Sequence, residues 1–138
     1  MKITYLALAF LITGYLLAGD AYGEDEIYYC TESDSTGFAY DDKIEAYAPG
    51  FYRPGKFKLK INRTSNSIVL AREAPEIYVC ATPFPNRPEL MICADKLLPS
   101  FHFNFNNKTG RFVLSQNHGY VTGDGDALKI AYGKCDKF

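Results

Sequence analysis

Apolar and polar residues alternate most strictly over residues 56–61. The alternation sends Phe57, Leu59 and Ile61 to one side and three lysines to the other, which is typical of a half-buried β-strand. The following residues have turn composition, and residues 67–71 can form a returning strand. This part of the chain therefore predicts an antiparallel hairpin.

A second alternation covers residues 101–105 and predicts another hairpin. When a four-residue loop joins this run to the next apolar run, Phe105 lies opposite Phe112, and Phe103 lies opposite Leu114. All four apolar side chains then share one face. The loop length and the apolar pattern thus support the same register.

Shorter runs of β-prone residues complete the predicted set of strands. They cover residues 27–31, 37–40, 77–80, 90–93, 119–122 and 127–132, and residues 44–55 form a loop or an edge segment. In the last strand, Leu128, Ile130 and Tyr132 are expected to face the core. The polar residues 32–36 are expected to form a turn, and only residues 89–98 could turn helically. The whole pattern predicts an all-β fold, either an antiparallel sandwich or a small barrel with little helix.

The first residues of the chain have the pattern of a secretory signal. Lys2 precedes an uncharged apolar stretch, residues 5–18, which is shorter than the roughly 20 residues that a membrane helix needs. Small residues follow, so we expect cleavage after Gly23, with Ala21 as the alternative. Residues 24–138 are then a single secreted or periplasmic domain that keeps no membrane anchor.

All four cysteines lie downstream of this signal. Four cysteines allow three pairings. If the runs that end at Cys80 and Cys93 face each other, these two cysteines can bridge, and Cys30 and Cys135 are left to tie the first strand to the last. An exported domain favours structural disulfides, and no Cys-x-x-Cys pair points to a metal site.

The net charge of the chain does not indicate a particular class of partner. Fifteen basic and sixteen acidic residues give a formal net charge of −1. No global field attracts nucleic acid or an anionic membrane, so we expect neither as a ligand. We also expect no cofactor and no metal.

The chain has eleven tyrosines, ten phenylalanines and no tryptophan. Aromatic rings often grip peptides or sugars. Tyr47, Phe51, Tyr52 and Arg53 are placed among two Pro-Gly corners and form the predicted recognition surface. The alternative is that these rings cap the end of the core.

The two histidines are the natural candidates for proton transfer. A small secreted hydrolase, most plausibly a nuclease, could use His102 and His118 with Lys108, Arg111 or Lys129 as the phosphate partner. The predicted hairpin register, however, places His102 on the face away from the phenylalanines. This favours ordinary surface histidines over a catalytic pair.

Several short motifs of the chain resemble those of small exported bacterial proteins of uncharacterised function. They are Tyr28-Tyr29-Cys30, Phe103-Asn104-Phe105-Asn106, Thr109-Gly110-Arg111-Phe112, Gly119-Tyr120-Val121-Thr122-Gly123 and Tyr132-Gly133-Lys134-Cys135. In size and expected architecture the chain is also similar to the periplasmic inhibitors of c-type lysozyme, which are small disulfide-tied β-barrels. Those inhibitors have a Ser-Gly-x-Lys/Arg-Tyr-type segment, and residues 115–120 match it poorly.

The sequence as a whole predicts a binding or inhibitor-like module with no evident catalytic site. Its ligand would be a protein or a glycan, and we expect a monomer. The small hydrolase is one alternative. The other is an envelope structural component, which would self-associate through an exposed sheet edge.

Overall fold

The computed structural model describes residues 25–138, so the expected signal segment, residues 1–23, lies outside the described residues. The described part forms nine β-strands and one short helix. The strands are β1 (Glu26–Asp41), β2 (Ala46–Phe51), β3 (Lys56–Asn62), β4 (Ser67–Ala71), β5 (Glu76–Ala81), β6 (Leu90–Asp95), β7 (Phe101–Asn106), β8 (Arg111–Gln116) and β9 (Leu128–Lys137). The helix, α2 (His118–Thr122), connects β8 to β9. In this part of the chain, no helix is long and apolar enough to cross a membrane.

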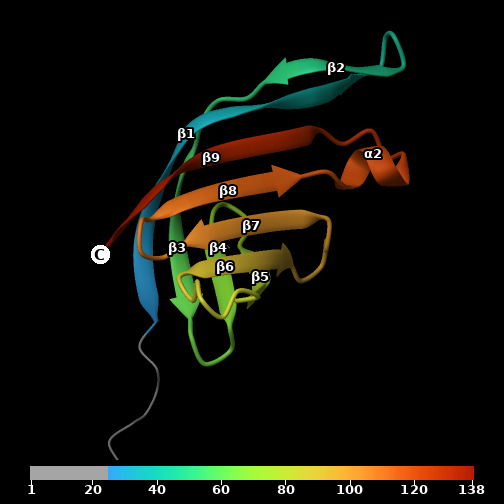
Figure 1. Ribbon diagram of the computed structural model, residues 1–138. Helices are drawn as coiled ribbons and strands as arrows, with labels where there is room; N and C mark the ends of the chain where they lie inside the picture. The colour runs from blue at the N-terminus through green and yellow to red at the C-terminus, as the bar shows by residue number, and fades with distance from the viewer. Residues whose placement is uncertain (1–24) are drawn as a thin grey trace, which may run out of the picture.

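The strands form one antiparallel sheet that closes on itself. Its order is β2-β1-β3-β4-β5-β6-β7-β8-β9, and β1 also pairs with β9. Eight strands, β1 and β3–β9, therefore make a closed barrel, and β2 is added outside it along the second half of β1 (Figure 1). The all-β prediction is confirmed, and the architecture is the small barrel rather than the sandwich.

The alternating segments fill the barrel as predicted. Phe105 pairs with Phe112, and Phe103 pairs with Leu114, so all four side chains point inward and are buried. The rings of Phe103 and Phe112 stack with centroids 5.3 Å apart, and Phe57 of β3 meets Phe112 edge to face. Ring pairs of this kind add to the free energy gained by burying their apolar area.

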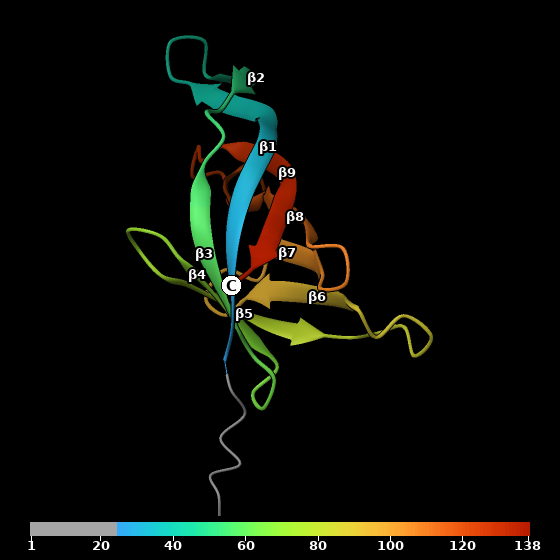
Figure 2. The same ribbon diagram turned by 90° about the vertical axis from the view of Figure 1, so that its left-hand side faces the viewer.

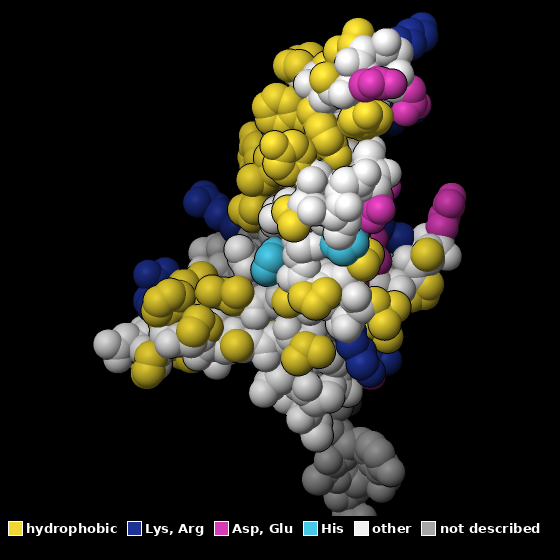
Figure 3. Space-filling model, turned by 90° about the vertical axis from the view of Figure 1, so that its right-hand side faces the viewer, with side chains coloured by type: hydrophobic (Ala, Val, Ile, Leu, Met, Phe, Trp, Pro, Cys, Tyr) yellow, Lys and Arg dark blue, Asp and Glu magenta, His cyan; other side chains and the backbone are white. Residues whose placement is uncertain are grey.

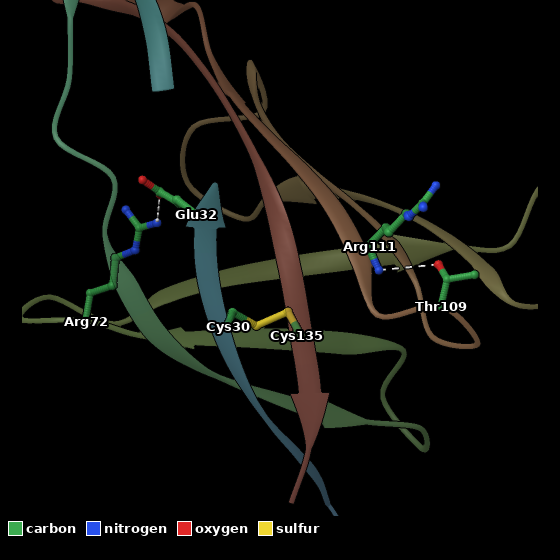
Figure 4. Close-up of a disulfide and its surroundings, with 6 residues drawn as sticks. All are labelled: Cys30, Glu32, Arg72, Thr109, Arg111 and Cys135. Carbon is green, nitrogen blue, oxygen red and sulfur yellow. Dashed lines mark hydrogen bonds and ion pairs between the residues drawn. A yellow bond between two sulfur atoms is a disulfide. The ribbon is translucent and has the colours of Figure 1, made fainter. Parts of the chain in front are cut away.

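The disulfide pairing is also as predicted. Cys30 of β1 lies directly opposite Cys135 of β9 (Figure 4). Cys80 of β5 lies opposite Cys93 of β6. All four sulfur-bearing side chains are buried inside the barrel. The first bridge ties the two strands whose pairing closes the sheet. Two such bridges indicate an oxidising environment.

The predicted turn at residues 32–36 is wrong, because β1 runs through it without a break. The side chain of Glu32 points into the barrel, where Arg72 neutralises it. A β-bulge between Glu32 and Asp34 then bends the strand and keeps Ser35 on the inner side. In Figure 2 this long strand rises along the barrel and turns away above it. The polar residues here therefore lie at a bend within one strand and not in a turn between two strands.

The predicted inward face of the last strand is also wrong. Ala131, Gly133 and Cys135 point inward, so Ile130 and Tyr132 point outward. Cys135 must point inward to reach Cys30, and strand geometry then fixes the side of every other residue. The tight closure also needs glycine at position 133, since a Cβ there would lie 2.1 Å from the carbonyl oxygen of Thr31.

Two short segments take the opposite structure to the one predicted. Residues 119–122 belong to α2, whose single turn ends at Gly123 in the left-handed conformation, with φ of 80°. Gly119 packs closely on Asp126, so a Cβ at position 119 would collide with the Asp126 backbone. In contrast, the possible helix at 89–98 is mostly strand β6, with alternate residues buried.

Candidate recognition site

The second half of β1 and all of β2 form a hairpin that projects beyond the barrel. We call residues 34–51 the arm. Tyr40 pairs with Tyr47 across the hairpin, and on the other side Phe38 pairs with Leu128 of β9. The arm is therefore continuous with the barrel wall while reaching past it, above α2 (Figure 1).

One side of the arm and the adjoining strand β9 carry large apolar side chains. Strand register places them together, and we call this set the outer face: Phe38, Tyr40, Tyr47, Leu128, Ile130 and Tyr132. Phe38, Ile130 and Tyr132 are 48%, 51% and 56% exposed. Figure 3 shows hydrophobic side chains gathered over this upper part of the molecule. Contiguous exposed apolar area of this kind is typical of an interaction site.

Tyr47 links the outer face to α2. Its ring meets the rings of Tyr40 and Tyr120 edge to face, each at 5.3 Å between centroids. Its hydroxyl donates a hydrogen bond of 2.9 Å to the carbonyl oxygen of Asp126. Partial desolvation raises the pKa of the Tyr47 hydroxyl, and the negative charge of Asp126 raises it further. The ring cluster thus holds the loop after α2 against the arm.

The other side of the arm carries small residues. Gly37, Ala39 and Gly50 lie there, and the ring of Tyr52 extends over them. The Tyr52 hydroxyl donates a 3.0 Å hydrogen bond to the carbonyl oxygen of Phe38, and the ammonium group of Lys129 lies 5.7 Å from the ring centroid. Tyr52 therefore supports the arm from its inner side.

The four residues of the predicted recognition surface do not act as one patch. Tyr47 lies within the outer face, and Phe51 faces the same way at the end of β2, where it is 93% exposed. Tyr52 turns to the inner side, and Arg53 is exposed in the link to β3. The edge segment itself is confirmed, because β2 is the outermost strand. A binding role for the four side chains stays a prediction.

The sequence interpretation missed most of the outer face. Phe38 was assigned to a separate short strand, and Ile130 and Tyr132 were expected to face the core. The inward position of Cys135 was the signal that could have corrected the last strand, since residues 131 and 133 share its side.

A buried carboxylate closes the barrel below the arm. Glu32 is 3% exposed and accepts hydrogen bonds from Arg72 Nη2 at 3.0 Å and from the amide of Gly55 at 2.9 Å. The ammonium group of Lys129 lies 3.8 Å from Glu32 Oε2, the same oxygen that accepts from the Gly55 amide. Figure 4 shows Arg72 reaching Glu32 beside the disulfide. These contacts compensate the desolvation of the charge, so we assign Glu32 a structural role.

The two histidines make separate contacts. His118 Nδ1 lies 3.1 Å from the hydroxyl oxygen of Ser100, which forms a hydrogen bond, whereas His102 lies on the outward side of β7 opposite Ser115. Within residues 25–138, neither imidazole is hydrogen-bonded to a carboxylate that could orient it for catalysis. Across the same residues, no group of three or more potential metal ligands comes together. The two-histidine hydrolase stays a prediction that no contact supports.

The chain matches no protein-family model, no curated protein and no solved structure. Residues 115–120, which match the inhibitory motif of the lysozyme inhibitors poorly, span the end of β8 and the start of α2. The exposed surface of the protein is therefore the basis for a proposed function.

Proposed function

We propose that this protein is an exported binding module whose outer face docks on another protein. The observation that supports this most strongly is the row of exposed apolar side chains that crosses from the arm to β9. Phe38, Ile130 and Tyr132 are about half exposed although each lies in a regular strand. Aromatic and aliphatic side chains of this kind are enriched at the centres of protein interfaces.

The core of the barrel gains nothing from these residues. Its interior is already filled by buried phenylalanine and aliphatic side chains, which Phe57, Phe103 and Phe112 represent. The outward side of β3 differs from the outer face, because it carries Lys56, Lys58 and Lys60. The contrast supports a selected docking surface on the arm.

Two independent features support a location outside the cytosol. The N-terminal residues have the pattern of a secretory signal, and the two disulfides need an oxidising compartment to persist. A secreted or periplasmic protein would meet its partner outside the cytosol. The proposed partner is therefore another envelope or extracellular protein.

Site-specific photo-crosslinking tests this proposal. Two variants of the protein are compared, one with p-benzoylphenylalanine in place of Ile130 and the other with it in place of Val79. Both side chains are exposed in strands on different parts of the barrel wall. After irradiation in the envelope or extracellular fraction of the host, we expect a discrete protein adduct at position 130 and none at 79. Adducts of equal yield at both positions, or none at 130, would overturn the proposal.

A further inference from the structure

The small net charge hides an uneven distribution of charged residues. The arm, residues 34–51, and the segment that contains α2 and its connection to β9, residues 117–128, together contain six acidic residues and one basic residue, Lys43. The rest of the described chain contains thirteen basic and eight acidic residues. The molecule therefore has an acidic end, which bears Phe38, Tyr40, Tyr47 and Leu128 of the outer face. The rest of the barrel is basic and bears Ile130 and Tyr132.

The carboxylates surround the outer face. Asp34 lies directly opposite Tyr132 on the outward side of the β1–β9 pair. Asp124 and Asp126 lie close enough to Tyr47 for their charges to raise the pKa of its hydroxyl. Asp41, Asp42 and Glu45 are at the tip of the hairpin, next to the Tyr40–Tyr47 pair.

Among the described residues, these acidic groups form no ion pairs. Of the ion pairs formed among residues 25–138, none includes any of the six carboxylates. In contrast, the buried Glu32 is paired with Arg72, and Glu26 at the opposite end of the barrel is paired with Arg63 and Lys137. The negative potential around the outer face is therefore uncompensated.

We propose that the outer face binds a basic polypeptide, namely a protein segment that presents lysine or arginine side chains around an apolar centre. This inference rests on the proposed binding function and names the chemistry of its partner. Unpaired carboxylates at the rim of an interface attract a cationic partner during encounter and repel an acidic one. The apolar side chains in the centre then supply the contact area that excludes water.

The basic barrel of a second copy has the same chemistry as the proposed partner. Docking of the acidic end of one copy on the barrel of the next would build head-to-tail chains, because the two surfaces differ. The arm would then be covered by this protein itself. Sedimentation velocity of the protein alone separates this arrangement from binding to a different protein.

The test uses three labelled synthetic peptides of equal length and fluorescence anisotropy. One peptide combines leucine with lysine in an amphipathic pattern, the second has glutamate in place of lysine, and the third has serine in place of leucine. We expect the leucine–lysine peptide to bind and the leucine–glutamate peptide not to bind. The serine–lysine peptide should bind at least about tenfold more weakly because it lacks the apolar contact.

Matched variants locate the binding. Asp124→Asn combined with Asp126→Asn should weaken the leucine–lysine complex by about three- to tenfold, which corresponds to about 0.3–0.7 kcal/mol for each exposed charge. Glu73→Gln combined with Asp136→Asn removes two exposed carboxylates from the basic barrel and should change the affinity less than twofold. Raising the salt concentration should weaken the wild type toward the affinity of the Asp124/Asp126 variant.

The outcomes distinguish the two proposals. If a protein adduct forms at position 130 but the lysine and glutamate peptides bind equally, the partner is not basic and only the present inference fails. If both pairs of carboxylate variants weaken the peptide equally, the attraction is not local to the outer face and the inference also fails. If the protein alone sediments in a concentration-dependent way, the occupant of the outer face is a second copy of this chain, and the inference of a different basic partner fails. The absence of any adduct at position 130 would remove both proposals.

Discussion

The barrel and the arm share strand β1, but the large side chains of β1 point inward in the barrel and outward in the arm. In the first half of β1, alternate residues such as Tyr28 and Cys30 are buried in the core. Beyond the bulge, the inward positions hold Gly37 and Ala39, which are too small to form a core. The large side chains there, such as Phe38, point outward instead.

This difference assigns the stability of the fold to the barrel and the proposed binding surface to the arm. The barrel has the buried rings, both disulfides and the ion pairs of Glu26 and Glu32. The arm has an open edge at β2 and a largely exposed apolar side. Substitutions in the barrel should therefore change the free energy of unfolding, whereas substitutions on the arm should change binding.

The largest effect is expected from the disulfide that closes the barrel. Replacing Cys30 and Cys135 by alanine should lower the free energy of unfolding by about 4–5 kcal/mol, because this bridge closes a loop of about 100 residues in the unfolded chain. Replacing Cys80 and Cys93 should cost about 3 kcal/mol, since that loop is short. Urea unfolding followed by circular dichroism measures both. A larger loss from the Cys80–Cys93 bridge would contradict the assignment of the barrel seam to β1 and β9.

Two phenylalanines compare the regions directly. Phe103→Ala should cost about 3–5 kcal/mol, because the side chain is fully buried between other rings. Phe51→Ala should change the free energy of unfolding by less than about 0.5 kcal/mol, since that ring is exposed at the end of β2. The same urea titration applies. Similar losses for the two variants would show that the arm is part of the stabilising core.

The buried carboxylate is expected to have a smaller effect. Glu32→Gln keeps an acceptor for the amide of Gly55 but leaves Lys129 without its anion and Arg72 with only Glu76, at 4.0 Å. We expect a loss of about 2 kcal/mol, because both cations retain some contact with solvent. Glu73→Gln is the control for removing an exposed carboxylate. A neutral Glu32→Gln substitution would mean that the desolvation of Glu32 offsets its ion pairs.

The smallest effect is a pH dependence at the end of the barrel opposite the arm. The hydrogen bond from Arg63 holds the pKa of Glu26 down at about 2, from an ordinary value of 4.5. Because the folded pKa is lowered, the stabilisation is present above pH 4.5 and is lost as the pH falls toward 2. Glu26→Gln should therefore cost about 1 kcal/mol at pH 6 and almost nothing at pH 2, as measured by urea unfolding. An unchanged difference at the two pH values would contradict the ionised pair.

Local patterns in the sequence were sufficient for much of the barrel. The alternation in β3 and the matching phenylalanines of β7 and β8 follow from neighbouring residues, so their register could be predicted. The pairing of Cys80 with Cys93 followed from two adjacent strands. These features depend on contacts between segments that are close in the chain.

The parts that were missed depend on distant contacts. The inward side of β9 is set by the bridge from Cys135 to Cys30, across 105 residues of sequence. Strand β1 can continue through Glu32 because its buried carboxylate pairs with Arg72, which is distant in the sequence. The outer face depends on both, because the bulge and the side assignment of β9 together bring Phe38 and Ile130 to the same surface.

The most direct test of the separation between barrel and arm compares two double variants, each in two assays on the same sample. Phe38→Ser combined with Ile130→Ser removes two exposed side chains from the outer face, and Ile77→Ser combined with Val79→Ser removes two from β5. We expect the first variant to lose retention of the crosslinked partner while its urea midpoint stays close to that of the wild type, and the β5 variant to retain the partner. Retention by the first variant, or loss of the partner together with the fold, would contradict a binding surface that the barrel supports but does not need.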